Sequence, residues 1–172
     1  MAVGIADIHK AVQTRWTADG LDATFRALWP VGTDATQFPV LHDTEATPDN
    51  PRPYCVFTIE ASNTRHRMSH DKANIREVRQ ALLVFEVYAG VVDGDARSAK
   101  QIAAYLGEEV MKKFGGHPDP AEVPEPLVLD NGNFLQSQFQ GDQIIRDGDD
   151  DFHYRLPYVL LVDVVSAVTN VV

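Results

Sequence analysis

The stretch that decides the fold is Ile75-Arg-Glu-Val-Arg-Gln-Ala-Leu-Leu-Val-Phe-Glu-Val-Tyr88. Its side chains alternate with a period of two, which is typical of a β-strand. One side collects apolar residues and the other mixes apolar with polar residues: Ala81, Leu83, Phe85 and Val87 against Arg76, Val78, Gln80, Leu82, Val84 and Glu86. The stretch therefore predicts a long strand with one face on a core and the other partly exposed.

Other segments predict the strands that would pair with it. Tyr54-Cys-Val-Phe-Thr-Ile-Glu60 is rich in β-branched and aromatic residues, and Phe152–Val165 alternates over its whole length. Weaker strand patterns cover residues 38–42 and 133–145. Short polar turns, such as Asp147-Gly-Asp-Asp-Asp151, favour hairpins and hence a mostly antiparallel sheet.

The last predicted strand changes character along its length. From Val159 onward it is apolar on nearly both faces, which predicts that both faces are covered there. Pro157 cannot donate a hydrogen bond to a ladder, so we expect it at a sheet edge or a bulge. We expect the second covering layer to come from a neighbouring subunit or from the N-terminal helix folding back. Val159 and Leu161 are therefore candidates for either a self-assembly contact or a core strand.

Two helices are predicted. The first carries an apolar stripe at spacings of three and four, formed by Ile5, Ile8, Val12 and Trp16. The second is a long helix with its stripe at Ala96, Ala99, Ala103, Leu106, Val110 and Phe114, ended by Gly115-Gly116. Residues 21–29 fit a short helix or an irregular stretch. The order of elements predicts a single α+β domain over residues 1–172, with a mostly antiparallel sheet and helices packed on one side.

Length and composition exclude several classes of protein. A chain of 172 residues with 44% hydrophobic and 23% charged residues is of ordinary globular type. A single cysteine excludes an internal disulfide framework and a Cys-rich zinc site. No apolar run approaches the ~18 residues needed to span a membrane. The N-terminus lacks a basic region ahead of an apolar stretch, so we expect a protein made and kept in the cytoplasm.

The net charge of −10 is spread unevenly. The balance of Lys/Arg over Asp/Glu is −4 in residues 1–60, +2 in residues 61–116 and −8 in residues 117–172. A strongly acidic last third argues against a general nucleic-acid binder, which presents a basic face. It is compatible with a protein that lets nucleic acid pass without binding it.

Two segments are predicted to be irregular. Residues 61–74 are polar and predict a protruding loop or the tip of a hairpin. The most basic window of the chain starts there, and it reads either as a solvated hairpin or as an arm that docks on an acidic partner. The candidate contacts are Arg65, Arg67, Met68 and Lys72. Residues 117–126 hold four prolines and predict a stiff connector.

A search for reactive groups gives no assembled site. The acidic run lacks the glycine and glutamate positions of an EF-hand loop and is better explained as a solvated turn. His66 and His70 could share a metal only on a helix, where the pattern is poor. Cys55 lies within an apolar strand, which favours a packed core thiol over a nucleophile, and His153 has no nucleophile at motif spacing. We therefore predict no enzyme and no catalytic, cofactor-binding or metal residues.

The order and lengths of these elements resemble the tail terminator (tail completion) proteins of long-tailed bacteriophages and phage-like gene-transfer particles. The segments that carry the resemblance are the helix from Ile5-Ala-Asp-Ile8, the strands Pro53-Tyr-Cys-Val-Phe57 and Gln80–Tyr88, the helix Ser98–Leu106 and the closing Tyr154-Arg-Leu-Pro-Tyr-Val-Leu-Leu-Val162. Together they span nearly the whole chain. The resemblance implies an α+β subunit of a hexameric ring that caps the tail tube, ends its growth and joins the tail to the head connector.

The resemblance also implies partners and a location. These are further copies of the chain, the tail tube protein, the head–tail connector protein and DNA that passes without specific binding. The location would be a virion tail, assembled in the host cytoplasm. Asp147, Asp149, Asp150 and Asp151 are candidates for an acidic bore or rim. The alternatives are another head–tail connector or tail-tube subunit and, from another class, a small ligand-binding or enzymatic α+β domain.

Overall fold

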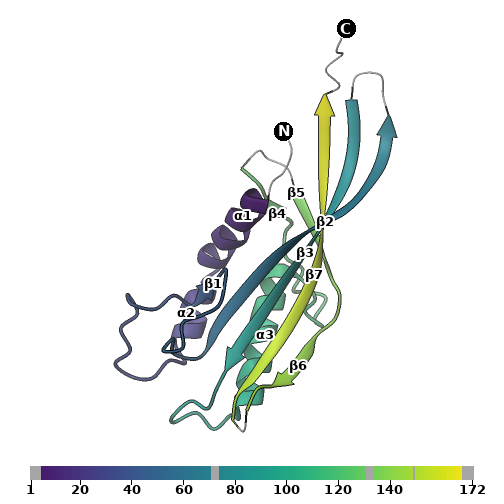
Figure 1. The fold of residues 1–172 in the computed structure, drawn as a ribbon. Helices are drawn as coiled ribbons and strands as arrows, with labels where there is room; N and C mark the ends of the chain where they lie inside the picture. Colours follow the sequence, from purple (N-terminus) through teal and green to yellow (C-terminus); the bar gives the residue numbers. More distant parts are fainter. Residues whose placement is uncertain (1–4, 71–73, 131–133, 149, 168–172) are drawn as a thin grey trace.

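The computed structural model describes residues 5–70, 74–130, 134–148 and 150–167. For the strand residues 61–79, 134, 136 and 162–167 within these ranges it describes the backbone alone. The fold is α+β, as the sequence predicts, with helices packed against one mostly antiparallel sheet (Figure 1).

The sheet is built around two long strands that hydrogen-bond along their full length. β3 (Asn74–Ala89) pairs with β7 (Phe152–Ala167) from Asn74↔Ala167 to Ala89↔Phe152. β2 (Tyr54–His70) lies on the other side of β3, and the order across the sheet is β1-β2-β3-β7-β5-β4. The short strands are β1 (Leu41–His42), β4 (Leu127–Val128), β5 (Phe134–Phe139) and β6 (Gln143–Arg146). Within the described residues, only the pairing of β1 with β2 is parallel.

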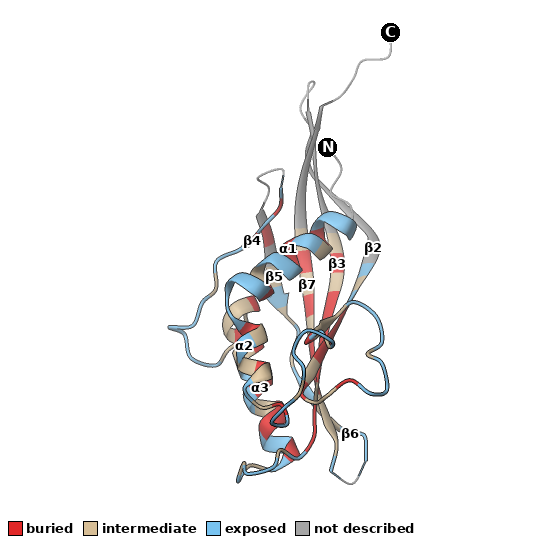
Figure 2. Cartoon of the chain, turned by 90° about the vertical axis from the view of Figure 1, so that its left-hand side faces the viewer, coloured by how far each residue is buried: buried red, intermediate tan, exposed pale blue. Residues whose placement is uncertain are grey.

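Three helices cover one face of this sheet, which we call the helix face. They are α1 (Ile5–Ala18), α2 (Leu21–Arg26) and α3 (Ala99–Phe114). Residues 21–29, for which the sequence allowed a short helix or an irregular stretch, contain the short helix α2. α3 starts after Ser98, whose side chain and that of Gln101 form a reciprocal capping box. In Figure 2 buried residues concentrate in α3 and in the middle of β3 and β7.

The aromatic side chains on the helix face bring the elements together. His9 and Trp16 of α1 lie against Phe57 and Phe85, with ring centroids 4.5 Å and 6.2 Å apart. Phe114 of α3 lies 4.6 Å from the same Phe85 ring. α1 and α3 therefore share one face of the sheet. Of the two sources expected for a cover on the second face, α1 lies on the helix face, so a neighbouring subunit is the one that stays a prediction.

The predicted loop at residues 61–74 is instead part of a long hairpin. β2 continues to His70 and β3 begins at Asn74, while residues 71–73 lie outside the described residues. Polar residues do not prevent a strand here, because hairpin pairing uses backbone groups that every non-proline residue carries. Of the two forms left open by the sequence, the hairpin is the one observed.

The predicted strand at residues 133–145 is broken in two. β5 pairs with β7 down to Phe139↔Tyr158, and β6 resumes at Gln143↔Arg155. The three residues 140–142 thus stand opposite two, and Gly141 has a φ of 113°, which favours glycine. The amide of Gln140 donates to the Pro157 carbonyl at 2.9 Å. The expectation that Pro157 lies at a bulge is confirmed.

Close packing between α3 and β7 generates a first prediction. A Cβ added to Gly107 would stand 1.8 Å from Cδ1 of Tyr154, so Gly107→Ala must displace either the helix or the ring. We expect a loss of ~1–3 kcal/mol in the free energy of unfolding, despite the roughly 1 kcal/mol that alanine gains over glycine in a helix. Urea unfolding of this variant and of Glu108→Ala, an exposed neighbour, measures the effect. Equal stability of the two variants would contradict the packing described.

Candidate assembly interface

The far ends of the three central strands form a ribbon that we call the arm. It comprises residues 65–70 of β2, 74–79 of β3 and 162–167 of β7. Figure 1 shows these strands continuing past the end of α1. The arm contains Arg65, Arg67 and Met68, three of the predicted partner contacts. The fourth, Lys72, lies outside the described residues.

The arm carries a net positive charge by sequence in an otherwise acidic chain. Its residues include four arginines against Glu77 and Asp163, a balance of +2. His66 and His70 lie on the same strand, where four residues span about 13 Å. The segment is a strand, so the helical spacing on which a shared metal depended is absent. Among the described residues no group of three or more potential metal ligands is found.

The second face of the sheet, which we call the open face, is not covered by any helix of the described chain. Register places on it an apolar cluster of Val56, Leu82, Val84, Pro157, Val159 and Leu161. Val84 and Val56 are 5% and 9% exposed, whereas Leu82, Val159 and Leu161 are half-buried. Glu60, Glu86 and Arg155 border the cluster.

Val159 and Leu161 are therefore only half-covered within one subunit, and their cover by a neighbouring subunit stays a prediction. Their neighbours Tyr158 and Leu160 point to the helix face and are 0% exposed. The alternation along β7 thus separates a complete core from a half-covered apolar surface. The stretch is apolar on both faces in sequence because Val159 and Leu161 lie on the open face, which the described helices do not cover.

The acidic turn before β7 is tied back to the sheet. His153 Nδ1 lies 2.7 Å and 2.8 Å from the two carboxylate oxygens of Asp147, and Asp151 forms an ion pair with Arg52. Asp150 is exposed, and Asp149 lies outside the described residues. Two of these carboxylates therefore have a cationic partner or a histidine beside them, so the turn carries less free charge than its sequence indicates.

The acidic turn and the arm lie at opposite ends of the molecule. The turn immediately precedes Phe152, the first residue of β7, and the arm begins at residue 162. Ten residues of strand span roughly 33 Å. The chain is thus elongated, with its acidic turn at one end and its arginine-rich arm at the other.

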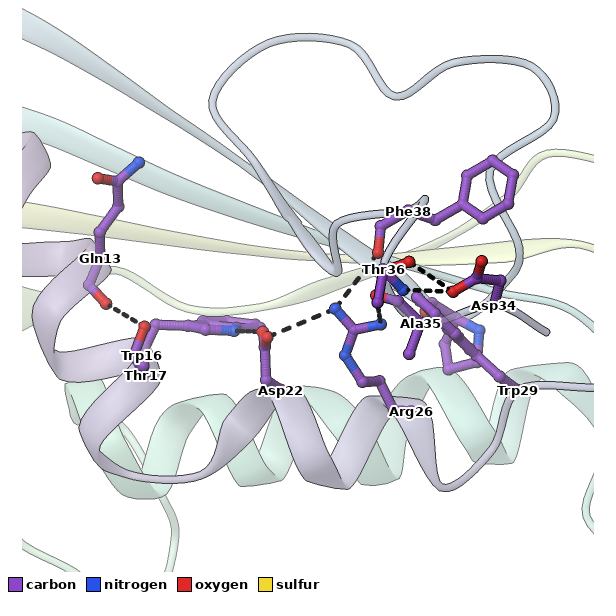
Figure 3. A network of polar contacts seen from close by, with 11 residues as sticks. Gln13, Trp16, Thr17, Asp22, Arg26, Trp29, Asp34, Ala35, Thr36 and Phe38 are labelled. Carbon is purple, nitrogen blue, oxygen red and sulfur yellow. Dashed lines mark hydrogen bonds and ion pairs between the residues drawn. The ribbon is translucent and has the colours of Figure 1, made fainter.

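Arg26 clasps the loop between α2 and β1, as Figure 3 shows. Its guanidinium donates from Nη1 to the Ala35 carbonyl at 2.9 Å and from Nη2 to the Phe38 carbonyl at 3.3 Å. The guanidinium carbon also lies 4.5 Å from the centre of the Trp29 ring. The arginine therefore fixes a loop that contains no helix or strand of its own.

Asp22 links this clasp to α1. Its carboxylate accepts a 2.7 Å hydrogen bond from Trp16 Nε1 and lies 3.7 Å from Nη2 of Arg26. Both terminal guanidinium nitrogens of Arg26 thus point to structural partners, as Figure 3 shows. The network has the character of a structural clasp and not of a ligand site.

The proline connector at residues 117–126 is fixed in a similar way. Arg15 of α1 donates to the carbonyls of Lys113, Glu125 and Pro126 at 3.2, 2.5 and 3.0 Å. Between the connector, the end of α3 and β5 lies a cleft of about 380 Å³. Its lining includes His117, Asp119 and Glu122, together with Pro120, Pro124 and Pro126.

The other reactive groups are not assembled into an enzyme site in the part of the chain that is described. Burial raises the pKa of the Cys55 thiol well above its ordinary value, which keeps the thiol protonated. His153 stacks on Tyr88 with centroids 5.0 Å apart, and its hydrogen-bonding partner is Asp147. No described helix is both long and apolar enough to cross a bilayer.

Comparison with known proteins does not place the chain in a family. Searches against protein families and against curated proteins give no match.

The Arg26 clasp generates a stability prediction. Arg26→Ala leaves two loop carbonyls without their donor and removes the contact with Trp29, so we expect a loss of ~1–3 kcal/mol in the free energy of unfolding. Arg155→Ala is the control, because Arg155 is exposed and its ion pair with Glu86 is long, at 3.6 Å, so its loss should cost under about 1 kcal/mol. Equal losses on urea unfolding would show that the clasp adds nothing.

The open face generates a prediction about self-association. Leu161→Asp places a charge in the half-covered apolar cluster, so we expect a subunit that folds but no longer self-associates. Thr14→Asp is the matched control, because Thr14 is exposed on α1, away from the open face. Circular dichroism measures folding and light scattering measures mass. A folded Leu161→Asp variant with the same mass as the control would show that this face is no interface.

Proposed function

We propose that the chain is a structural subunit of a phage tail. In this role several copies form a ring at the head-proximal end of the tail tube, end its growth and join the tail to the head connector. The proposal starts from the resemblance in element order to tail terminator proteins and implies a virion location. It assigns the chain no reaction.

The arm is the observation that carries the proposal. It extends three strands past the helices that form the core. Narrow β-ribbons are marginally stable in water unless something packs against them. Such an extension is of use to a protein that completes its packing against other chains, and its net positive charge suits an acidic partner surface.

The open face supports the same function. A subunit with half-buried Leu82, Val159 and Leu161 beside strongly buried Val84 has an apolar surface that assembly can cover. Homomeric rings need a surface of this kind on every copy. The helix face, whose large side chains are already buried, is complete within one subunit.

The acidic excess fits the passage of DNA. A net charge of −10 per chain, multiplied in a ring, repels phosphate wherever it lines a channel. Asp150 is exposed and free to act in this way at a rim, whereas Asp147 lies within hydrogen-bonding distance of His153 and Asp151 is paired with Arg52. A structure of the assembly with a strongly positive bore would overturn this part of the proposal.

Mass measurement tests the core of the function. Light scattering on the purified protein, alone and after addition of tail tubes, should show a discrete multimer and its attachment to tube ends. Binding along tube sides would favour a tail-tube subunit, and binding to head connectors without tubes would favour a connector subunit. A protein that stays monomeric with every component would contradict all three.

The arm generates the prediction for function. The triple variant Arg65→Glu, Arg67→Glu and Lys72→Glu should fold normally, because residues 61–74 are polar in sequence and charge changes in polar segments usually cost little stability. It should join tails to heads less well, since the arm would now repel an acidic partner. The yield of infectious particles is the measurement, and the variant Lys10→Glu, Lys100→Glu and Lys113→Glu is the charge-matched control. Equal yields from both variants would reject the arm as a partner contact.

A further inference from the structure

Both outer edges of the arm are open in the described chain. β1 pairs with β2 only at Cys55 and Val56, so the outer edge of β2 has no described strand beside it from residue 57 onward. On the other side, the pairing of β5 with β7 ends at Leu135↔Val162. Residues 65–70 of β2 and 163–167 of β7 therefore present free backbone groups at the same height of the ribbon.

The two open edges run in the same direction. β2 and β7 are both antiparallel to β3, so they are parallel to each other. A neighbour related by rotation about an axis along the arm would bring its β2 beside β7 of the first copy, in parallel. The contact joins two different edges, so it repeats from copy to copy and closes into a ring when the rotation between copies is a whole fraction of a turn.

We propose that the arms of neighbouring copies join edge to edge, with β7 of one copy pairing in parallel with β2 of the next. The occupant of each open edge is thus a second copy of this chain. An open strand edge is a template for the extended backbone of another chain, and this chain carries both halves of the contact. This inference rests on the proposed ring function and names the interface that would hold the ring together.

The irregular pairing of β2 with β3 favours arms that close into a cylinder over arms that stack into a flat sheet. The register of β2 against β3 shifts between Ala61 and Arg65 and again between Arg67 and Ser69. Bulges of this kind increase the local twist of a strand, which hinders flat edge-to-edge aggregation. Twist and bending are also what a sheet needs in order to close on itself.

Engineered cysteines test the pairing. Ser69 and Val165 both pair with Arg76, so they lie at the same height on the two open edges. We expect the double variant Ser69→Cys with Val165→Cys to give, after mild oxidation of the assembled full-length protein, a ladder of covalent multimers on a denaturing gel. Replacing Val165→Cys by Asp163→Cys or Ala167→Cys covers a shift of register in either direction. Buried Cys55 stays in place in every variant.

The controls separate this interface from other forms of association. Ser69→Cys alone should stay monomeric on the gel, and so should Ser69→Cys with Val31→Cys, because Val31 is fully exposed in a loop away from the arm. A covalent dimer from Ser69→Cys alone would indicate β2 against β2 about a twofold axis and would overturn the proposal. The longest band of the ladder counts the copies in the ring.

The two proposals fail in different ways. If light scattering finds a multimer that caps tubes but no cysteine pair on β2 and β7 gives a ladder, edge-to-edge pairing is wrong and the proposed function stands. If the protein stays monomeric with and without tubes, both are wrong. If the ladder forms but the multimer ignores tail tubes, the arm pairing stands and the proposed function fails.

Discussion

The position of Phe85 in the middle of β3 is the constraint on which the rest of the structure depends. Its ring contacts aromatic side chains from four other elements: Trp16 of α1, Phe57 of β2, Phe114 of α3 and Tyr158 of β7. Each contact is worth roughly 0.5–1.5 kcal/mol beyond the burial of its area. Because all four partners lie on one side of β3, both long helices must share that side, and the other side of the sheet is left without a helix.

The strand alternation that places Phe85 is visible in the sequence, and this is why the fold class could be predicted. The same alternation shows Val159 and Leu161 as apolar, but period alone cannot tell whether a chain covers its own second face or leaves it to another molecule. That distinction depends on how many helices reach each face. It requires the positions of His9 and Trp16 in space, which no local pattern contains.

Two outcomes beyond the local pattern have a common cause. The sequence left residues 61–74 open between a loop and the tip of a hairpin, and it predicted one unbroken strand at residues 133–145. In both cases the outcome depends on a partner strand: β3 holds β2 in extended form up to His70, and Pro157 stands opposite the break at residues 140–142. Likewise, the sequence showed the acidic turn at residues 147–151 but not its partners Arg52 and His153, which come from separate segments.

The charge of the arm adds a condition to the assembly described above. Arms joined edge to edge bring together a balance of +2 from every copy, and like charges at this spacing repel one another unless they are screened or neutralised. Backbone pairing between arms is therefore opposed by charge in the free protein and favoured on an acidic surface. A ring built in this way would form most readily where its partner presents an acidic surface. Added salt would also screen the repulsion between arms and so would do part of what the partner does. The open backbone edges would then supply the geometry of the ring, and the arginines would set where it forms.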